Sequence, residues 1–237
     1  MNDGDMKTSS TISNKSGAAP QLTFSEKYDL NHAQAYFDKH QAGFWRRLSD
    51  WRDQQVARKA LELADKPQSV LDLPCGTGRF WSLLAEEKDR KIIACDYSQD
   101  MIDIGMRHRD PAVTQRITTL QSSAFDLDFP DEAVDNIFCI RLLHHIGHSE
   151  DRLRLLTELR RVTRATVIIS LWVDGNVKAW RRRKLESKRA HRDYQNRFVI
   201  PASQVEREFE AAGFKIKAHL DFLPKYAMWR TYVLEKN

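Results

Sequence analysis

The sequence contains no apolar run that approaches the roughly 18 residues a membrane-spanning helix requires. Its N-terminal residues also lack the apolar central region of a secretory signal. The 237 residues are 41% hydrophobic and 30% charged, which is typical of a globular protein with its own core. We therefore expect a cytoplasmic protein with one folded domain, preceded over residues 1–22 by a disordered tail that is too polar to pack.

Cysteine is scarce, with three residues in the chain, at Cys75, Cys95 and Cys139. Their number is odd, and they form neither a C-x-x-C pair nor a spacing with histidine of the zinc-binding type. Cys95 and Cys139 lie in strand-like apolar runs, where a buried thiol behaves as a small hydrophobic group. We predict three reduced thiols.

Positive charge is unevenly distributed along a chain whose net charge is only +5. Between Lys178 and Arg197, nine Lys or Arg residues stand against two acids. This basic insertion, about 174–200, is either a solvated helix face or a cover that binds anions, from phosphorylated, carboxylated or lipid-headgroup acceptors to RNA phosphates. The modest net charge argues against a nucleic-acid partner, although RNA stays an alternative.

Strand-like apolar runs alternate with helical patterns from residue 69 onward. We expect strands at 69–73, 91–96, 117–122, 134–140, 165–172, 215–223 and 228–236. We expect helices at 79–88, 98–108, 150–163 and 202–214, the last capped by Ser203 and ended by Gly213. The alternation predicts a doubly wound α/β fold, with a mostly parallel sheet covered by helices on both faces.

A helical segment rich in aromatic residues precedes the first strand. Residues 25–64 contain no proline and one glycine, and their apolar positions recur at helical spacing. We therefore expect an N-terminal helical lid over 23–66, followed by the main domain over 67–237. Tyr36, Phe37 and Trp45 in the lid are candidates to contact a substrate.

The turn after the first expected strand has the composition of a ligand-binding loop. Gly76 and Gly78 allow a sharp turn with a ligand lying against the backbone, and Asp96 ends the next strand, where its carboxylate can bind both hydroxyls of a ribose. A dinucleotide fingerprint would place a third glycine where Trp81 stands. The carboxylate of Asp72 would repel a pyrophosphate but suits an ammonium group.

Residues 69–146 resemble the core of the class I S-adenosylmethionine-dependent methyltransferases. VLDLPCGTG (70–78) is similar to their first motif, ACDYSQDMI (94–102) to the second, and residues 129–146 to the segment around their fourth strand. The end of the chain, a helix followed by two strands, also resembles the family. The resemblance implies a Rossmann-like, seven-stranded methyltransferase fold, with S-adenosylmethionine as cofactor.

The resemblance implies a set of cofactor-binding residues in two loops and beyond the fourth strand. They are Asp72, Pro74, Gly76, Gly78, Asp96, Tyr97, Met101, Ser123, Ala124, Phe125 and Arg141. Two positions depart from the family pattern: Pro74 replaces a glycine, and Ser123 stands where an acid usually contacts the adenine.

The acceptor is expected at the end of the fourth strand. His144 and His145 are candidate general bases there, or else they pack as structural residues, and Arg141 binds an anionic acceptor or forms an ion pair. The Asn/Asp-Pro-Pro-aromatic motif of amino-methylating members is absent, and so are the carboxylates of the metal-dependent type. We predict oxygen methylation without a metal.

The expected substrate is a small or medium-sized acceptor, anionic or linked to a lipid or saccharide. Trp180 and Arg183 in the basic insertion are further candidates to contact it. Two alternatives stay open: methylation of RNA or protein, and a non-catalytic regulatory protein that binds the cofactor. The sequence indicates nothing about the oligomeric state.

Overall fold

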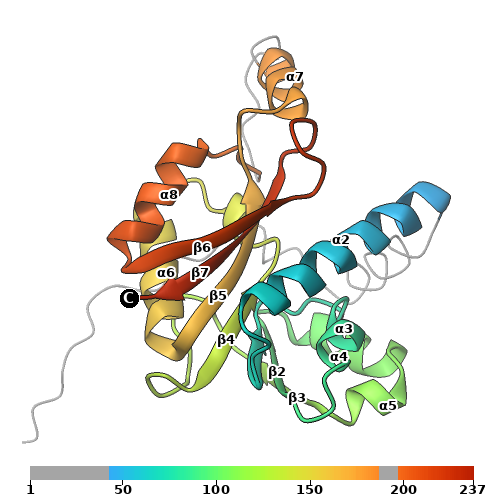
Figure 1. Ribbon diagram of the computed structural model, residues 1–237. Coiled ribbons are helices and arrows are strands. Elements are labelled where there is room, and N and C mark those ends of the chain that lie inside the picture. The colour runs from blue at the N-terminus through green and yellow to red at the C-terminus, as the bar shows by residue number, and fades with distance from the viewer. Residues whose placement is uncertain (1–42, 187–196) are drawn as a thin grey trace, which may run out of the picture.

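A single seven-stranded sheet runs through the protein (Figure 1). The computed structural model describes residues 43–186 and 197–237. The strands, in chain order, are β1 (Ser69–Asp72), β2 (Lys91–Asp96), β3 (Ile117–Gln121), β4 (Val134–Cys139), β5 (Thr163–Trp172), β6 (Phe214–Asp221) and β7 (Trp229–Lys236). Their order across the sheet is β3-β2-β1-β4-β5-β7-β6, with β1 to β5 parallel and β7 antiparallel to both of its neighbours. The predicted fold class is confirmed.

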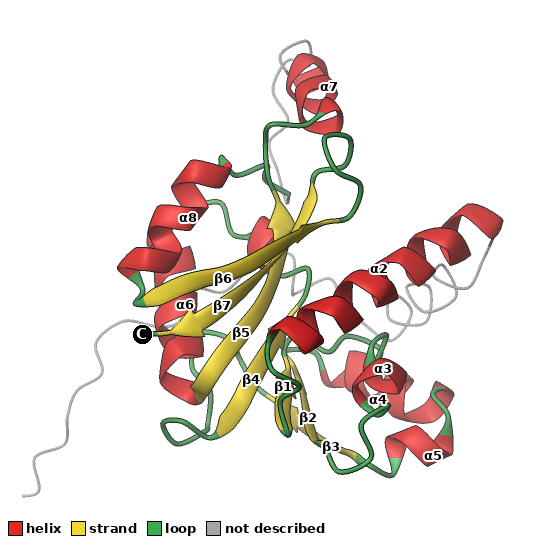
Figure 2. Cartoon of the chain, in the orientation of Figure 1, coloured by secondary structure: helices red, strands yellow, loops and turns green. Residues whose placement is uncertain are grey.

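Helices cover both faces of the sheet, as Figure 2 shows. They are α2 (Phe44–Leu63), α3 (Trp81–Leu84), α4 (Gln99–His108), α5 (Pro111–Thr114), α6 (Ser149–Val162), α7 (Val177–Glu186) and α8 (Ala202–Ala211), with a 3-10 turn, η2 (Leu143–His145). Helices α6 and α8 lie on one face, and α2, α3 and α4 pack on the other. Among these helices, none is both long and apolar enough to span a bilayer. The part of the predicted lid before residue 43, including Tyr36 and Phe37, lies outside the described residues.

The central strands are apolar at successive residues because helices bury both of their faces. In β4, Ile137 packs with the α6–α8 side, whereas the next residue, Phe138, packs with the α2–α4 side. In β5, Ile169 packs with the α6–α8 side and Ile168 packs with the α2–α4 side. Successive strand side chains point to opposite faces, so a strand covered on both sides requires apolar residues in sequence rather than in alternation.

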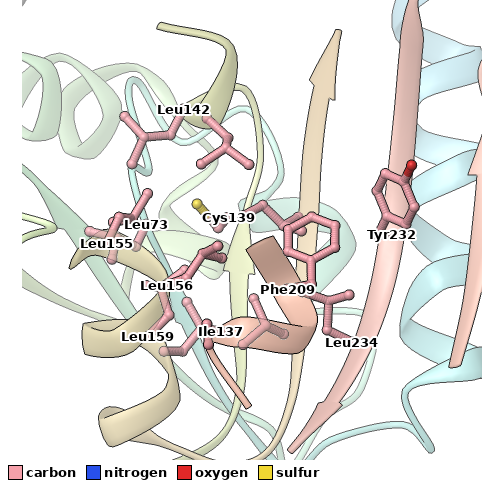
Figure 3. Close-up of a cluster of buried hydrophobic side chains, with 14 of the residues drawn as sticks. Leu73, Ile137, Cys139, Leu142, Leu155, Leu156, Leu159, Phe209, Tyr232 and Leu234 are labelled. Carbon is pink, nitrogen blue, oxygen red and sulfur yellow. The ribbon is translucent and has the colours of Figure 1, made fainter. Parts of the chain in front are cut away.

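The larger of the two cores joins β4, β5 and β7 to α6 and α8 (Figure 3). Leu155, Leu156 and Leu159 recur at helical spacing along α6 and are fully buried. Phe209 from α8 packs edge to face on Tyr232, with ring centroids 5.1 Å apart. Truncation of one such side chain to alanine costs about 2–5 kcal/mol, so this core fixes the sheet that carries the ligand loops.

The first predicted helix is shorter than expected, because 79–88 forms a helix only over Trp81–Leu84. The carbonyls that would continue it accept hydrogen bonds from arginine side chains. Arg90 donates to Leu84 at 3.1 Å, and Arg116 donates to Ala85 at 2.6 Å and to Glu87 at 2.7 Å. These donors come from later in the chain, so local helix propensity did not reveal them.

The predicted cap of the last long helix was also wrong. Ser203 lies inside α8, and Pro201 occupies the N-cap position. The Asp174 carboxylate, 28 residues earlier, accepts the backbone N–H of Ala202 at 3.0 Å. The predicted end is confirmed, since Gly213 has a φ of 82°, a conformation that favours glycine.

The short helix α5 was missed, although its start is marked in the sequence. Asp110 accepts the backbone N–H of Ala112 at 2.9 Å, and Pro111 occupies the first helical position. An Asp-Pro pair at a helix start is a common signal.

A buried ion pair joins α6 to α8. Arg152 donates to both carboxylate oxygens of Glu208, at 2.7 and 2.6 Å, and to the carbonyls of Ile146 and Gly147. Burial by itself raises the pKa of Glu208, but hydrogen bonds from Arg152 and Ser149 hold it below its ordinary value. Both side chains are nearly inaccessible to solvent. Removal of either one would therefore leave a buried charge without a counter-ion, which is strongly destabilising.

We expect Glu208→Gln to lower the free energy of unfolding by about 3–5 kcal/mol, because it leaves the Arg152 charge buried without a counter-ion. Urea unfolding at pH 7 measures this change. Glu210→Gln, at an exposed position of the same helix, is the control and should change stability by less than about 0.5 kcal/mol. Since the Glu208 pKa is lowered, the difference should shrink as pH falls below the ordinary glutamate value of 4.5. Equal stability of both variants at pH 7 would contradict the assignment.

Candidate cofactor and acceptor site

The loop after β1 turns sharply at two glycines. Gly76 and Gly78 have φ values of 54° and 68°, which L side chains rarely adopt. A Cβ atom on Gly78 would lie 2.4 Å from the ring of Trp81, which is fully buried beneath the loop. The indole therefore fills the space beneath the loop, and the loop backbone is held at the carboxyl edge of the sheet.

Asp96 at the end of β2 fixes the position of this loop. One of its oxygens accepts the backbone N–H of Gly76 at 2.8 Å, and the other accepts that of Ser98 at 3.0 Å. Burial raises the pKa of Asp96, and these backbone hydrogen bonds reduce the rise. Each oxygen keeps a further lone pair, so the carboxylate can still accept hydrogen bonds from two ribose hydroxyls.

Asp72, at the end of β1, carries a buried oxygen without a hydrogen-bond partner among the described residues. Burial, followed by the charge of Asp96, raises the pKa of Asp72 well above its ordinary value. An unpaired buried carboxylate is costly, and a cationic ligand group would remove that cost. The position favours an ammonium ligand at the first turn.

The side of the site beyond β2 contains the other predicted cofactor residues. Tyr97 is about half exposed, and its carbonyl accepts a hydrogen bond from the Gln121 side chain at 2.9 Å. Met101 is buried, with its methyl group 3.6 Å from the position of a Cβ on Gly76. Ser123 bridges to Asp126 in the loop after β3, which also contains Ala124 and Phe125.

A network of ion pairs connects α2 to this site. Arg79, directly after the glycine loop, donates to Asp50 at 2.7 Å and to Asp53 at 2.6 Å. Arg141 donates to the same Asp53 at 2.5 Å, and its guanidinium lies 4.8 Å from the ring centre of Trp229. Sequence analysis missed this role of Arg79, Asp50 and Asp53, because the partners lie 26 to 88 residues apart.

Arg141 has a φ of 67°, an uncommon backbone conformation for a residue with a side chain. Its backbone N–H donates to the Ser170 hydroxyl on β5 at 2.9 Å. The ion pair of Arg141 with Asp53 agrees with one of the two roles predicted for Arg141. Contact of Arg141 with the cofactor stays a prediction.

A pocket lies between α2 and the carboxyl edge of β4 and β5. Its walls are largely apolar, with Arg141 and Asp53 as the charged groups. It is lined by Asp53, Val56, Ala57, Phe80, Ile140, Arg141, Ser170, Phe222, Trp229 and Thr231. Phe80 belongs to the segment that follows the glycine loop, so the pocket and the loop share one wall.

His144 and His145 lie together beside this pocket, with ring centroids 4.0 Å apart. His144 is buried against Trp172 and Trp229 at 5.0 and 4.8 Å. Burial, then the nearby His145 and Arg197, hold the pKa of His144 far below its ordinary value. A ring that stays neutral is a weak base, which favours the packing interpretation for His144. The catalytic assignment of His145, which is partly exposed, stays a prediction.

Three residues predicted to contact a substrate, Trp45, Trp180 and Arg183, do not line this pocket. Trp45 and Trp180 are largely exposed, at 78% and 61%. Arg183 lies 3.9 Å from Asp174 on the outer part of the basic insertion. Across residues 43–186 and 197–237, no group of three or more His, Cys, Asp or Glu side chains is arranged to hold a metal ion.

Comparison with known proteins finds similarity to methyltransferases. Residues 70–166 of this chain match a family model described as a methyltransferase domain. The magnesium protoporphyrin IX methyltransferase of Synechocystis PCC 6803, solved with bound SAH, has the same fold, with a TM-score of 0.67, 14% identity, and coverage of 83% of this chain and 89% of that one.

Two curated relatives are more similar in sequence but longer. A probable tRNA methyltransferase 9B of Bos taurus is 26% identical over 147 residues, which are 61% of this chain and 28% of the relative. A demethylmenaquinone methyltransferase of Bacillus cereus is 26% identical over 144 residues, 59% of this chain and 54% of the relative. This chain therefore spans about half or less of the length of these two curated relatives.

The described residues fit S-adenosylmethionine, which is bound in a second structure of the Synechocystis enzyme. The Asp72 oxygen without a hydrogen-bond partner suits the methionyl ammonium, the loop at Gly76 and Gly78 admits a ligand against its backbone, and Asp96 suits the ribose. The individual residue roles stay predictions.

Replacement of Asp96 by alanine should weaken binding of S-adenosylhomocysteine by roughly 10-fold to 100-fold, because the ribose loses charge-assisted hydrogen bonds and the loop loses its anchor. Isothermal titration calorimetry measures the affinity. Asp103→Ala, at an exposed position of the adjacent helix, is the control. Unchanged affinity in Asp96→Ala would remove Asp96 from the site.

Affinity for S-adenosylhomocysteine should also depend on pH through Asp72. Because the pKa of Asp72 is raised, lowering the pH protonates it and removes its attraction for the ligand ammonium, so affinity should fall as the pH is lowered. Asp72→Asn should bind more weakly at pH 8 and show a shallower pH dependence, measured by the same titration. A wild-type slope in Asp72→Asn would assign the pH dependence to another group.

Proposed function

We propose that this protein transfers a methyl group from S-adenosylmethionine to an oxygen atom of a small or medium-sized anionic acceptor. The observation that carries the proposal is the pocket beside the glycine loop, which combines apolar walls with the ion pair of Arg141 and Asp53. Ligand sites of this type use apolar surface for affinity and a few polar groups for orientation. A carboxylate or phenolate combines an apolar body with an anionic oxygen, which are the properties that the apolar walls and Arg141 would contact.

Methyl transfer from S-adenosylmethionine requires few catalytic groups from the protein. S-adenosylmethionine supplies an electrophilic methyl group on a sulfonium that is its own leaving group. The chain therefore needs to hold an acceptor in line and exclude water. Helix α2, joined to the loop through Arg79 and Asp53, supports the exclusion of water by covering the pocket wall.

Arg141 is the proposed acceptor-orienting residue. Its guanidinium is held between Asp53 and the face of Trp229, so its direction is set before an acceptor arrives. An acceptor that is already anionic needs no base, whereas a neutral hydroxyl needs one. His145 is the candidate base in that case, since His144 is neutral and buried.

Methylation of RNA is the second candidate, favoured by the similarity to a tRNA methyltransferase and by the exposed Trp180 among basic residues. Methylation of RNA, of protein and of a small molecule would use different acceptors but the same predicted cofactor site. The division into a lid over 23–66 and a main domain over 67–237, and the cytoplasmic location, likewise stay proposals.

Transfer of tritium from S-(methyl-³H)adenosylmethionine tests the proposal. We expect label in a panel of carboxylic acids and phenols, free or linked to lipid or saccharide, rather than in total RNA or protein. Arg141→Gln should reduce labelling of the accepted compound about tenfold or more by removing a charged hydrogen bond, and calorimetry with S-adenosylhomocysteine separates a loss of acceptor contact from a loss of cofactor contact. His145→Ala should reduce turnover only for neutral acceptors.

Each other outcome has a distinct meaning. Label in RNA or protein would replace the small acceptor with a macromolecule. Binding of S-adenosylhomocysteine with no transfer across all three acceptor classes would favour the regulatory alternative.

A further inference from the structure

The helix α7 projects from the end of the sheet, at the carboxyl edge of β5 (Figure 1). Its inward face carries Ala179, which is buried, and Arg182, whose guanidinium lies 4.9 Å from the ring centre of Trp172. The other residues of the helix are exposed.

The outward face of α7 is both apolar and basic. Val177, Trp180 and Leu185 are 41%, 61% and 56% exposed. Arg181 and Lys184 are also exposed, and a helix repeat of 3.6 residues places them on the same side as these three. Exposed aliphatic and aromatic groups gathered on one face are unusual for a surface that meets only water.

The turn between β6 and β7 extends this face. The carbonyls of Lys225 and Tyr226 accept the backbone N–H groups of Val177 and Lys178, both at 3.0 Å. Leu223 and Tyr226 are 45% and 43% exposed, and the Lys178 ammonium lies 5.3 Å from the Tyr226 ring centre. We call α7 together with residues 222–228 the basic–apolar tip.

We propose that the basic–apolar tip is a docking surface for an anionic lipid bilayer. Trp and Tyr favour the headgroup level of a membrane, and Lys and Arg beside them attract anionic headgroups. The aliphatic side chains decide between this partner and RNA. Val177, Leu185 and Leu223 gain from burial among acyl chains, whereas a nucleic acid offers phosphates and base faces.

The balance of charge supports an anionic partner. Helix α7 contains five basic residues, Lys178, Arg181, Arg182, Arg183 and Lys184. Its acid, Glu186, forms an ion pair with the inward Arg182 at 2.7 Å, so the positive charge of the outward face is not offset by it. The face combines the two signals, apolar area and basic charge, that interfacial helices use.

Co-sedimentation with vesicles tests the surface without any acceptor. The full chain should bind vesicles of phosphatidylcholine with 30% phosphatidylglycerol, bind pure phosphatidylcholine far more weakly, and release with rising salt. Arg181→Glu/Lys184→Glu should weaken binding about 25-fold or more, since each lost charge alone is worth about fivefold. Trp180→Ala/Leu185→Ala should weaken it about tenfold through lost apolar contact.

Matched controls change the same properties elsewhere. Lys88→Glu/Arg107→Glu makes the same charge change at exposed positions, one in the segment after α3 and one in α4, and these two helices lie far from α7 (Figure 1). Met106→Ala/Leu120→Ala removes two side chains that are each 37% exposed. Both controls should bind vesicles as the wild type does. Every variant should also keep its affinity for S-adenosylhomocysteine, which separates loss of docking from loss of folding.

Three results would overturn the proposal. They are equal binding to neutral and anionic vesicles, equal loss in the controls, and retention on RNA with no binding to vesicles. Vesicle binding and methyl transfer are separate measurements, so a failure of the docking proposal is distinguished from a failure of the proposed function.

Discussion

The hydrogen bonds to Asp96 join two loops of the candidate cofactor site. One carboxylate accepts from Gly76 in the loop after β1 and from Ser98 at the start of α4. The strands beneath are fixed in register by parallel pairing, with Asp72 opposite Ala94. The group that suits a ribose is thus the group that sets the backbone around it, so loop geometry and ligand binding are coupled through a single side chain.

A second constraint comes from the buried carboxylate of Asp72. The two cores bury the end of β1 from both faces, so this charge has little contact with water. Burial makes the ionised form of Asp72 costly and therefore raises its pKa. A cationic ligand group beside the carboxylate would lower the pKa again. Binding energy at this site is therefore linked to protonation, in addition to shape.

The sequence predicted the strands well and the side-chain partnerships poorly, for physical reasons. Strands such as β2, expected and found at Lys91–Asp96, follow from apolar runs that local composition displays. The end of α3 and the cap of α8 depend on Arg116 and Asp174, which lie far away in sequence. The spacing of the residues predicted the sharp turn at Gly76 and Gly78 and the end of β2 at Asp96. The pairing of Arg79 and Arg141 with Asp53 leaves no local pattern.

The burial of the three cysteines has a practical consequence for chemical labelling. Cys75, Cys95 and Cys139 are free and buried, and burial raises the thiol pKa at each, to about 12 at Cys95. The reactive species is the thiolate, so alkylating reagents will find little of it in the folded protein. A cysteine introduced at an exposed position would then be modified selectively, and a spectroscopic probe could report on that position without removal of the native residues.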